Sequence, residues 1–217
     1  MAGIYLHIPF CKQACHYCNF HFATSLRQKE QLVQALQKEI NLQAGYLKKE
    51  PVETIYFGGG TPSLLSTSEL ESIFKTIRIA HWVDSSAEIT LEVNPDDVTL
   101  DQLKAWKDAG VNRLSIGIQS FNDIDLQWMN RAHTAKQALD ALENCLRFFE
   151  NCTLDLIYGL PHMSRTDWKN NLTQALQLGV PHLSCYALTV EPKTALQHLV
   201  QKNSCNLPMK TYKVNNF

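Results

Sequence analysis

The sequence lacks three features that would each place it in a class of protein. Its 217 residues contain no apolar run near the roughly 18 residues of a membrane-spanning helix, so membrane contact is expected only through a partner. Lysine and arginine total 20 against 21 aspartates and glutamates, and without net positive charge we expect no nucleic-acid binding. No basic leader precedes the first apolar stretch, so we expect a cytoplasmic protein.

The seven cysteines also lack the pattern of a disulfide framework. Their number is odd, and a reducing compartment would not preserve disulfides. Four of them, Cys145, Cys152, Cys185 and Cys205, are scattered through apolar segments, so we expect them to pack as small hydrophobic residues. The other three lie within eight positions of one another and need a separate explanation.

What the sequence does contain is a regular alternation of short apolar strands and amphipathic helices. We expect strands at residues 4–8, 54–57, 88–93, 113–118, 153–157 and 182–188, and helices near 26–44, 67–80, 100–108, 135–149, 167–177 and 195–201. Such alternation implies parallel strands joined by right-handed crossovers. Six units predict an α/β fold, a partial (β/α)6 barrel of the TIM type with parallel strands; a doubly wound open sheet is the competing topology.

Polar residues and glycines mark several expected helix ends. Three pairs fit a capping box at a helix start: Ser66 with Glu69, Thr99 with Gln102, and Thr134 with Gln137. Three glycines stand where a left-handed residue would end a helix: Gly45, Gly110 and Gly179.

Several expected strands carry polar side chains on one face, among them Tyr5, Glu92, Gln119 and Asp155. An ordinary barrel interior is filled with branched aliphatic residues, whereas buried polar groups need partners. A polar ligand inside the barrel would supply those partners. The alternatives are water, mutual hydrogen bonds, or exposure of this face in an open barrel.

Cys11, Cys15 and Cys18 follow the first strand directly, where parallel α/β folds place their active sites. Three thiolates on one loop can converge on a soft metal centre. A [4Fe–4S] cluster would leave one of its irons without a protein ligand and free to bind a small chelating molecule.

The alternative is zinc with a histidine as the fourth ligand, for which the candidates are His7, His16 and His21. Structural zinc sites usually combine two distant ligand pairs, and no second pair follows in the sequence.

The chain resembles the radical S-adenosylmethionine (SAM) superfamily in its Cys-x3-Cys-x2-Cys loop. More narrowly, it is similar to the oxygen-independent coproporphyrinogen III oxidase group and its relatives, the haem chaperones. The similar stretches are residues 5–11, 57–62, 92–96, 112–121 and 155–161. The resemblance implies a radical SAM core over residues 1–195 and, where the pattern fades, a truncated or atypical tail over 196–217 without the family's C-terminal domain.

This resemblance implies a [4Fe–4S] cluster held by the three cysteines, with SAM bound to its fourth iron. The other cofactor contacts that it implies are Gly59, Gly60 and Thr61 at the methionyl group, Glu92 at the ammonium, Arg131 at the carboxylate, Gln119 and Asp155 at the ribose, Tyr5 at the sulfonium, Tyr17 near the adenine, and Ala187 lining the site. It assigns no separate catalytic residue. Read alone, Arg131 and His133 would fit a solvated helix start.

Two departures favour the haem-chaperone branch. Phe20 stands where the oxidases carry a fourth cysteine, and the first strand begins near residue 4 without the oxidases' N-terminal extension. Haem binding and transfer is therefore the expected function, and coproporphyrinogen III oxidation is the alternative. The partners implied are haem or a porphyrin, a reductant protein of the flavodoxin or ferredoxin type, and a haem-acceptor protein.

Overall fold

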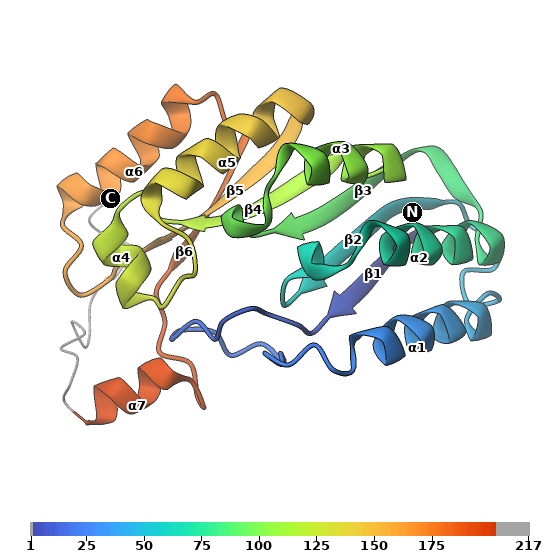
Figure 1. Cartoon of the computed structure of the whole chain (residues 1–217), viewed down its shortest axis with the longest axis horizontal. Helices are drawn as coiled ribbons and strands as arrows, with labels where there is room; N and C mark the ends of the chain where they lie inside the picture. Colours follow the sequence, from blue (N-terminus) through green and yellow to red (C-terminus); the bar gives the residue numbers. More distant parts are fainter. Residues whose placement is uncertain (1, 203–217) are drawn as a thin grey trace.

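The computed structural model describes residues 2–202 and contains one six-stranded parallel sheet. Its strands are β1 (Ala2–Ile8), β2 (Val52–Gly59), β3 (Val83–Val93), β4 (Arg113–Gln119), β5 (Asn151–Tyr158) and β6 (His182–Ala187). Each strand pairs with its successor in the chain, and within the described residues β1 and β6 remain the two open edges (Figure 1). This one-way order confirms the partial barrel, because a doubly wound sheet reverses its strand order at a switch point.

The described part of the chain has seven α-helices, most of which form an outer layer along the sheet, whereas the last one lies apart from that layer (Figure 1). They are α1 (Lys29–Leu42), α2 (Thr67–Ala80), α3 (Leu100–Ala109), α4 (Asp123–Trp128), α5 (Ala135–Phe148), α6 (Arg165–Gln177) and α7 (Ala195–Gln201). The short α4 is absent from the sequence-based expectation, because six residues are too few for a helical pattern to emerge. Among these described helices, none is both long and apolar enough to cross a bilayer.

The expected helix starts are largely confirmed. Ser66 and Thr134 each form a complete capping box, and Thr99 accepts a hydrogen bond from the Gln102 amide. Helix α1 begins at Lys29 rather than near residue 26, after Gln28, which gives no side-chain cap.

Two of the three expected glycine ends are confirmed. Gly110 and Gly179 adopt left-handed backbone angles, with φ of 107° and 72°. The expectation for Gly45 is wrong, because α1 already ends at Leu42 and the left-handed residues after it are Lys48 and Lys49.

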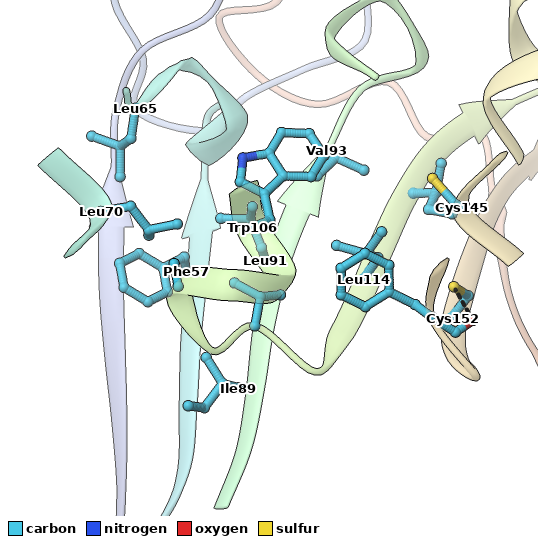
Figure 2. Packing of buried hydrophobic residues seen from close by; sticks show 14 of the residues in the cluster. Phe57, Leu65, Leu70, Ile89, Leu91, Val93, Trp106, Leu114, Cys145 and Cys152 are labelled. Atoms are coloured by element: carbon cyan, nitrogen blue, oxygen red, sulfur yellow. Dashed lines mark hydrogen bonds between the residues drawn. The ribbon is translucent and has the colours of Figure 1, made fainter. Parts of the chain in front are cut away.

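The hydrophobic core lies between the sheet and the outer helices. Phe57 of β2, Leu91 of β3 and Trp106 of α3 are at most 1% exposed and pack together there (Figure 2). Cys145 and Cys152 are fully buried in the same core, as expected, and burial raises the pKa of the Cys152 thiol to about 11. The expectation is wrong for Cys185, which is exposed on the edge strand β6; Cys205 lies outside the described residues.

The inner face of the sheet is polar, and near the amino ends of the strands its polar groups satisfy one another. Arg113 on β4 donates to Thr90 Oγ1 at 3.2 Å and also to Thr153 Oγ1, and its Nε lies 3.8 Å from Glu88 Oε1. Mutual hydrogen bonds therefore suffice in this layer, and no ligand is needed. The polar groups at the carboxyl ends of the strands are arranged differently.

Candidate functional site

A cavity of about 480 Å³ opens at the carboxyl ends of the strands. Its walls contain the three loop cysteines, Cys11, Cys15 and Cys18. They also contain every other predicted site residue except Tyr5, namely Tyr17, Gly59, Gly60, Thr61, Glu92, Gln119, Arg131, Asp155 and Ala187. The fold thus brings residues from all parts of the barrel into one site. Tyr5 lies beside the cavity, where it stacks on Tyr56 and remains 59% exposed.

The three cysteines are free thiols of intermediate exposure. Burial raises the pKa of Cys11 and of Cys18, and the neighbouring thiols raise them further once ionised. Arg131 opposes this effect, because its guanidinium Nη1 lies 3.4 Å from Cys15 Sγ. Three thiolates would therefore be stabilised by a bound cation or metal centre, with Arg131 as the nearest protein charge.

Two of the three histidines considered for the zinc alternative contact other groups through their rings, and none of the three lines the cavity. His16 Nδ1 lies 2.8 Å from the Trp128 carbonyl oxygen, and His7 Nε2 lies 3.2 Å from the His21 carbonyl oxygen. Within residues 2–202, no three His, Cys, Asp or Glu side chains gather around a point where one metal ion could sit. A cluster distributes its thiolates over different irons, and this all-sulfur donor set fits it.

Arg131 is held in place by four contacts but has one donor to spare. Its Nη2 donates to Asn94 Oδ1 at 2.7 Å and to the Gly117 carbonyl at 2.8 Å, and Nη1 lies 3.5 Å from Tyr17 Oη. Its Nε is buried without a hydrogen-bond partner. The interpretation as a solvated helix start is therefore wrong. A ligand carboxylate at this wall would meet a fixed guanidinium.

Two carboxylates, those of Glu92 and Asp155, form another polar part of the cavity wall. Glu92 accepts hydrogen bonds from Tyr56 Oη at 2.8 Å and from the Gly59 amide at 3.1 Å, and burial raises the pKa of Glu92. Burial, reinforced by the nearby Glu92 charge, raises the pKa of Asp155 to about 6, while Ser184 and Ser115 hydrogen-bond it. Such a wall suits a ligand that brings positive charge or hydroxyl donors.

The glycine loop after β2 has an internal packing role that the sequence analysis missed. A Cβ at Gly59, where φ is 110°, would lie 2.5 Å from the His7 ring, and one at Gly60 would lie 2.6 Å from the Phe10 carbonyl oxygen. The glycines therefore let the loop approach the protein's own first strand, and not only a ligand. Thr61 continues the loop and accepts from Asn94 Nδ2 at 3.1 Å.

Other supporting residues were also missed by sequence reasoning. Asn94 hydrogen-bonds both Arg131 and Thr61. The sequence analysis gave it no role, even though it lies in the stretch 92–96 that carries the resemblance. Lys12 in the cysteine loop pairs with Asp96 at 2.9 Å and also with Asp97. His133 does not line the cavity; it is 3% exposed, and burial, with Arg131 nearby, lowers its pKa to about 4.

Comparison with known proteins shows the superfamily of the chain. Residues 5–175 match the family described as the Radical SAM superfamily, and the chain belongs to that superfamily. The fold also matches the structure of coproporphyrinogen III oxidase (HemN) from Escherichia coli, a radical SAM enzyme. Their TM-score is 0.86 at 29% identity, over 95% of this chain and 49% of that one.

Within the superfamily, the chain is similar to proteins named heme chaperone HemW. It is 37% identical to the one from Bacillus subtilis over 211 residues, covering 96% of this chain and 56% of the relative. The one from Escherichia coli K12 is 39% identical over 198 residues, covering 88% of this chain and 52% of the relative. The chain thus spans about half the length of these relatives.

Proposed function

We propose that this chain binds a [4Fe–4S] cluster and SAM and supplies the radical SAM core, residues 1–195, of a haem chaperone. The observation that carries the proposal is the set of three free thiols beside Arg131 in a single cavity. Cys11, Cys15 and Cys18 would hold three irons of the cluster. When bound, the cluster supplies the electron for reductive cleavage of SAM.

The chain's own residues would then hold SAM by its charged groups. Arg131 would bind the carboxylate, and Glu92 would accept from the ammonium. Gln119 and Asp155 would hold the ribose hydroxyls, while Tyr17 and Ala187 would border the nucleoside. Tyr5 is the weakest member of the predicted set, because it lies outside the cavity wall.

Haem as the cargo is supported by the aromatic rim of the cavity and by the relatives' names. Phe20 and Tyr186 line the cavity while 66% and 55% exposed, and Phe22 lines the same cavity. Exposed aromatic faces of this kind suit a flat apolar macrocycle. A haem-acceptor protein and a reductant of the flavodoxin or ferredoxin type would complete the system, which we place in the cytoplasm.

Coproporphyrinogen III oxidation is the second candidate, favoured by the TM-score of 0.86 to the oxidase. It predicts 5′-deoxyadenosine and protoporphyrinogen IX when the reduced protein meets SAM and coproporphyrinogen III. Haem binding without these products would separate the chaperone from the oxidase.

The cluster is tested by anaerobic reconstitution followed by iron and sulfide analysis. We expect about four irons per chain, and their loss in Cys15→Ala. Cys185→Ala is the matched control, because Cys185 is exposed on β6 outside the cavity wall. Zinc in place of iron, or equal iron in both variants, would refute the proposal.

Haem binding is tested by anaerobic titration followed by absorbance. Phe20→Ala should weaken saturable binding by about two- to tenfold, since an aromatic contact contributes about 0.5–1.5 kcal/mol. Tyr46→Ala is the control, because Tyr46 is 76% exposed and not part of the cavity wall. Equal weakening in both variants would mean that haem adsorbs elsewhere.

A further inference from the structure

Asn130 ties the cysteine loop to the segment that carries Arg131. Its Nδ2 donates to the Ala14 carbonyl at 2.8 Å. Its Oδ1 and its carbonyl oxygen accept from Gln13 Nε2 at 2.8 and 3.0 Å. Gln13 and Ala14 lie between Cys11 and Cys15, so the Asn130 side chain hydrogen-bonds the loop just before its second cysteine. Asn130 itself does not line the cavity.

The backbone at Asn130 explains the direction of the next residue. Its φ is 58°, a left-handed conformation that asparagine tolerates better than most residues. This turn follows α4 and points Arg131 back toward the cavity, where its Nη1 reaches Cys15 Sγ at 3.4 Å. The loop and the guanidinium are thus fixed from adjacent positions in the chain.

Further contacts run along the same two segments. The His16 amide donates to the Met129 carbonyl at 3.1 Å, and His16 Nδ1 lies 2.8 Å from the Trp128 carbonyl oxygen. Residues 128–131 therefore contact residues 13–16 at successive positions.

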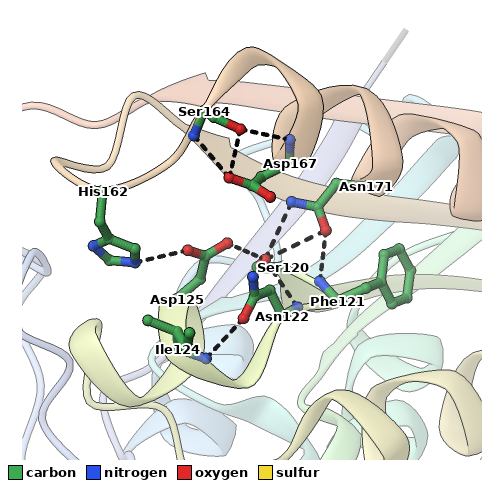
Figure 3. Close-up of polar contacts among 9 residues, drawn as sticks. All are labelled: Ser120, Phe121, Asn122, Ile124, Asp125, His162, Ser164, Asp167 and Asn171. Carbon is green, nitrogen blue, oxygen red and sulfur yellow. Dashed lines mark hydrogen bonds and ion pairs between the residues drawn. The ribbon is translucent and has the colours of Figure 1, made fainter.

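Helix α4, which leads into this segment, has its own anchor. Asp125 is 1% exposed and accepts from Ser120 Oγ at 2.6 Å, and Asn171 Nδ2 donates to the same Ser120 Oγ at 3.1 Å (Figure 3). Helix α4, which precedes Asn130 in the chain, is therefore linked by hydrogen bonds to the residue that follows β4 and through it to α6.

We propose that Asn130 is a positioning residue that holds the cysteine loop in register with Arg131. The inference rests on the proposed cluster. Outer partners of this kind fix the geometry of the ligands, and their loss typically weakens metal retention by about 10- to 100-fold. Neither the thiols nor Arg131 is altered by a change at this position.

Two variants separate the side chain from the backbone turn. Asn130→Gly keeps the left-handed turn without strain and removes all side-chain contacts with the loop. Asn130→Asp keeps an acceptor for Gln13 but loses the donor to Ala14. Lys49→Gly is the matched control, because Lys49 is an exposed non-glycine residue with a φ of 66° remote from the loop.

The first readout needs no cluster. Hydrogen exchange of the His16 backbone amide, which donates to the Met129 carbonyl at 3.1 Å, should be about tenfold faster in both Asn130 variants than in wild type when followed in cluster-free protein by mass spectrometry of overlapping peptides. The control should leave it unchanged. The unfolding midpoint, measured in parallel, shows whether the effect is local.

The second readout is the rate of iron loss to a chelator after reconstitution. We expect loss about tenfold faster in both Asn130 variants than in wild type and Lys49→Gly. Wild-type exchange and wild-type iron loss in the Asn130 variants would overturn the inference. If wild type itself assembled no cluster, the proposed function would fail, and the exchange measurement would still decide the role of Asn130.

Discussion

The absence of a side chain at residue 60 decides how closely the glycine loop approaches the start of the cysteine loop. A Cβ on Gly60 would meet the Phe10 carbonyl at 2.6 Å and the Ile8 carbonyl at 2.8 Å. The Gly60 amide also donates to Ile8 at 2.9 Å, so neither backbone can move away freely. Because Phe10 immediately precedes Cys11, this contact also fixes where the cysteine loop begins.

Gly60→Ala should therefore destabilise the protein by about 1–3 kcal/mol, through overpacking against backbone. Chemical denaturation of the cluster-free protein measures the change. Gly45→Ala is the control, since a Cβ there meets nothing within 4 Å, and it should cost nothing. A neutral effect at Gly60 would show that the loop can shift without loss of packing.

Helix α4 shows how a very short element acquires a fixed position. Ser120, Asp125 and Asn171 are at most 3% exposed and join the end of β4 to α4 and α6 (Figure 3). Asn171 Oδ1 also accepts from the Phe121 amide at 2.8 Å, and His162 Nε2 lies 2.9 Å from Asp125 Oδ1. Hydrogen bonds to buried groups, rather than helical propensity, hold this six-residue helix.

Asn171→Leu has nearly the same volume but leaves the Phe121 amide and the Ser120 hydroxyl without this partner. We expect a loss of about 3 kcal/mol in the free energy of unfolding. Asn170→Leu, on the exposed side of the same helix, should change it by less than about 0.5 kcal/mol. Similar losses in both variants would argue that the network contributes little.

At the scale of the whole molecule, the interior of the open barrel contains two largely buried acidic side chains. Burial and the Glu92 charge raise the pKa of Asp155 from its ordinary value of 3.8 to about 6. Folding therefore favours the protonated acid. The stability that the folded protein has with Asp155 protonated is fully present below about pH 3.8 and is lost as the pH rises through about 6.

Asp155→Asn removes this ionisation while keeping a polar group near Ser115 and Ser184. Relative to wild type, the variant should gain about 2 kcal/mol of stability between pH 4.5 and pH 7.5. Denaturant titrations of the cluster-free protein at both pH values provide the measurement. Asp101→Asn, an exposed change on α3, serves as control. A pH-independent difference between variant and wild type would contradict the buried-acid interpretation.

The sequence by itself determined the alternation of six strands with helices, most helix starts and the placement of three cysteines on one loop. These features follow from short-range patterns: alternation along strands, capping boxes, and three cysteines on one loop. It failed where a feature had too few residues to show a period, as in α4. It also failed for the end of α1, where no short-range signal places the last turn.

Only the tertiary structure decided which groups meet. Gly60 closely approaches Phe10, Arg131 is fixed by Asn94 and Gly117, and Asn130 hydrogen-bonds Ala14. Each of these contacts joins segments that are far apart in the chain. The tertiary structure also left the three candidate histidines and Tyr5 outside the cavity wall. The physical reason is that hydrogen-bond partners and close packing depend on how the strands and loops come together in space, which local sequence patterns do not encode.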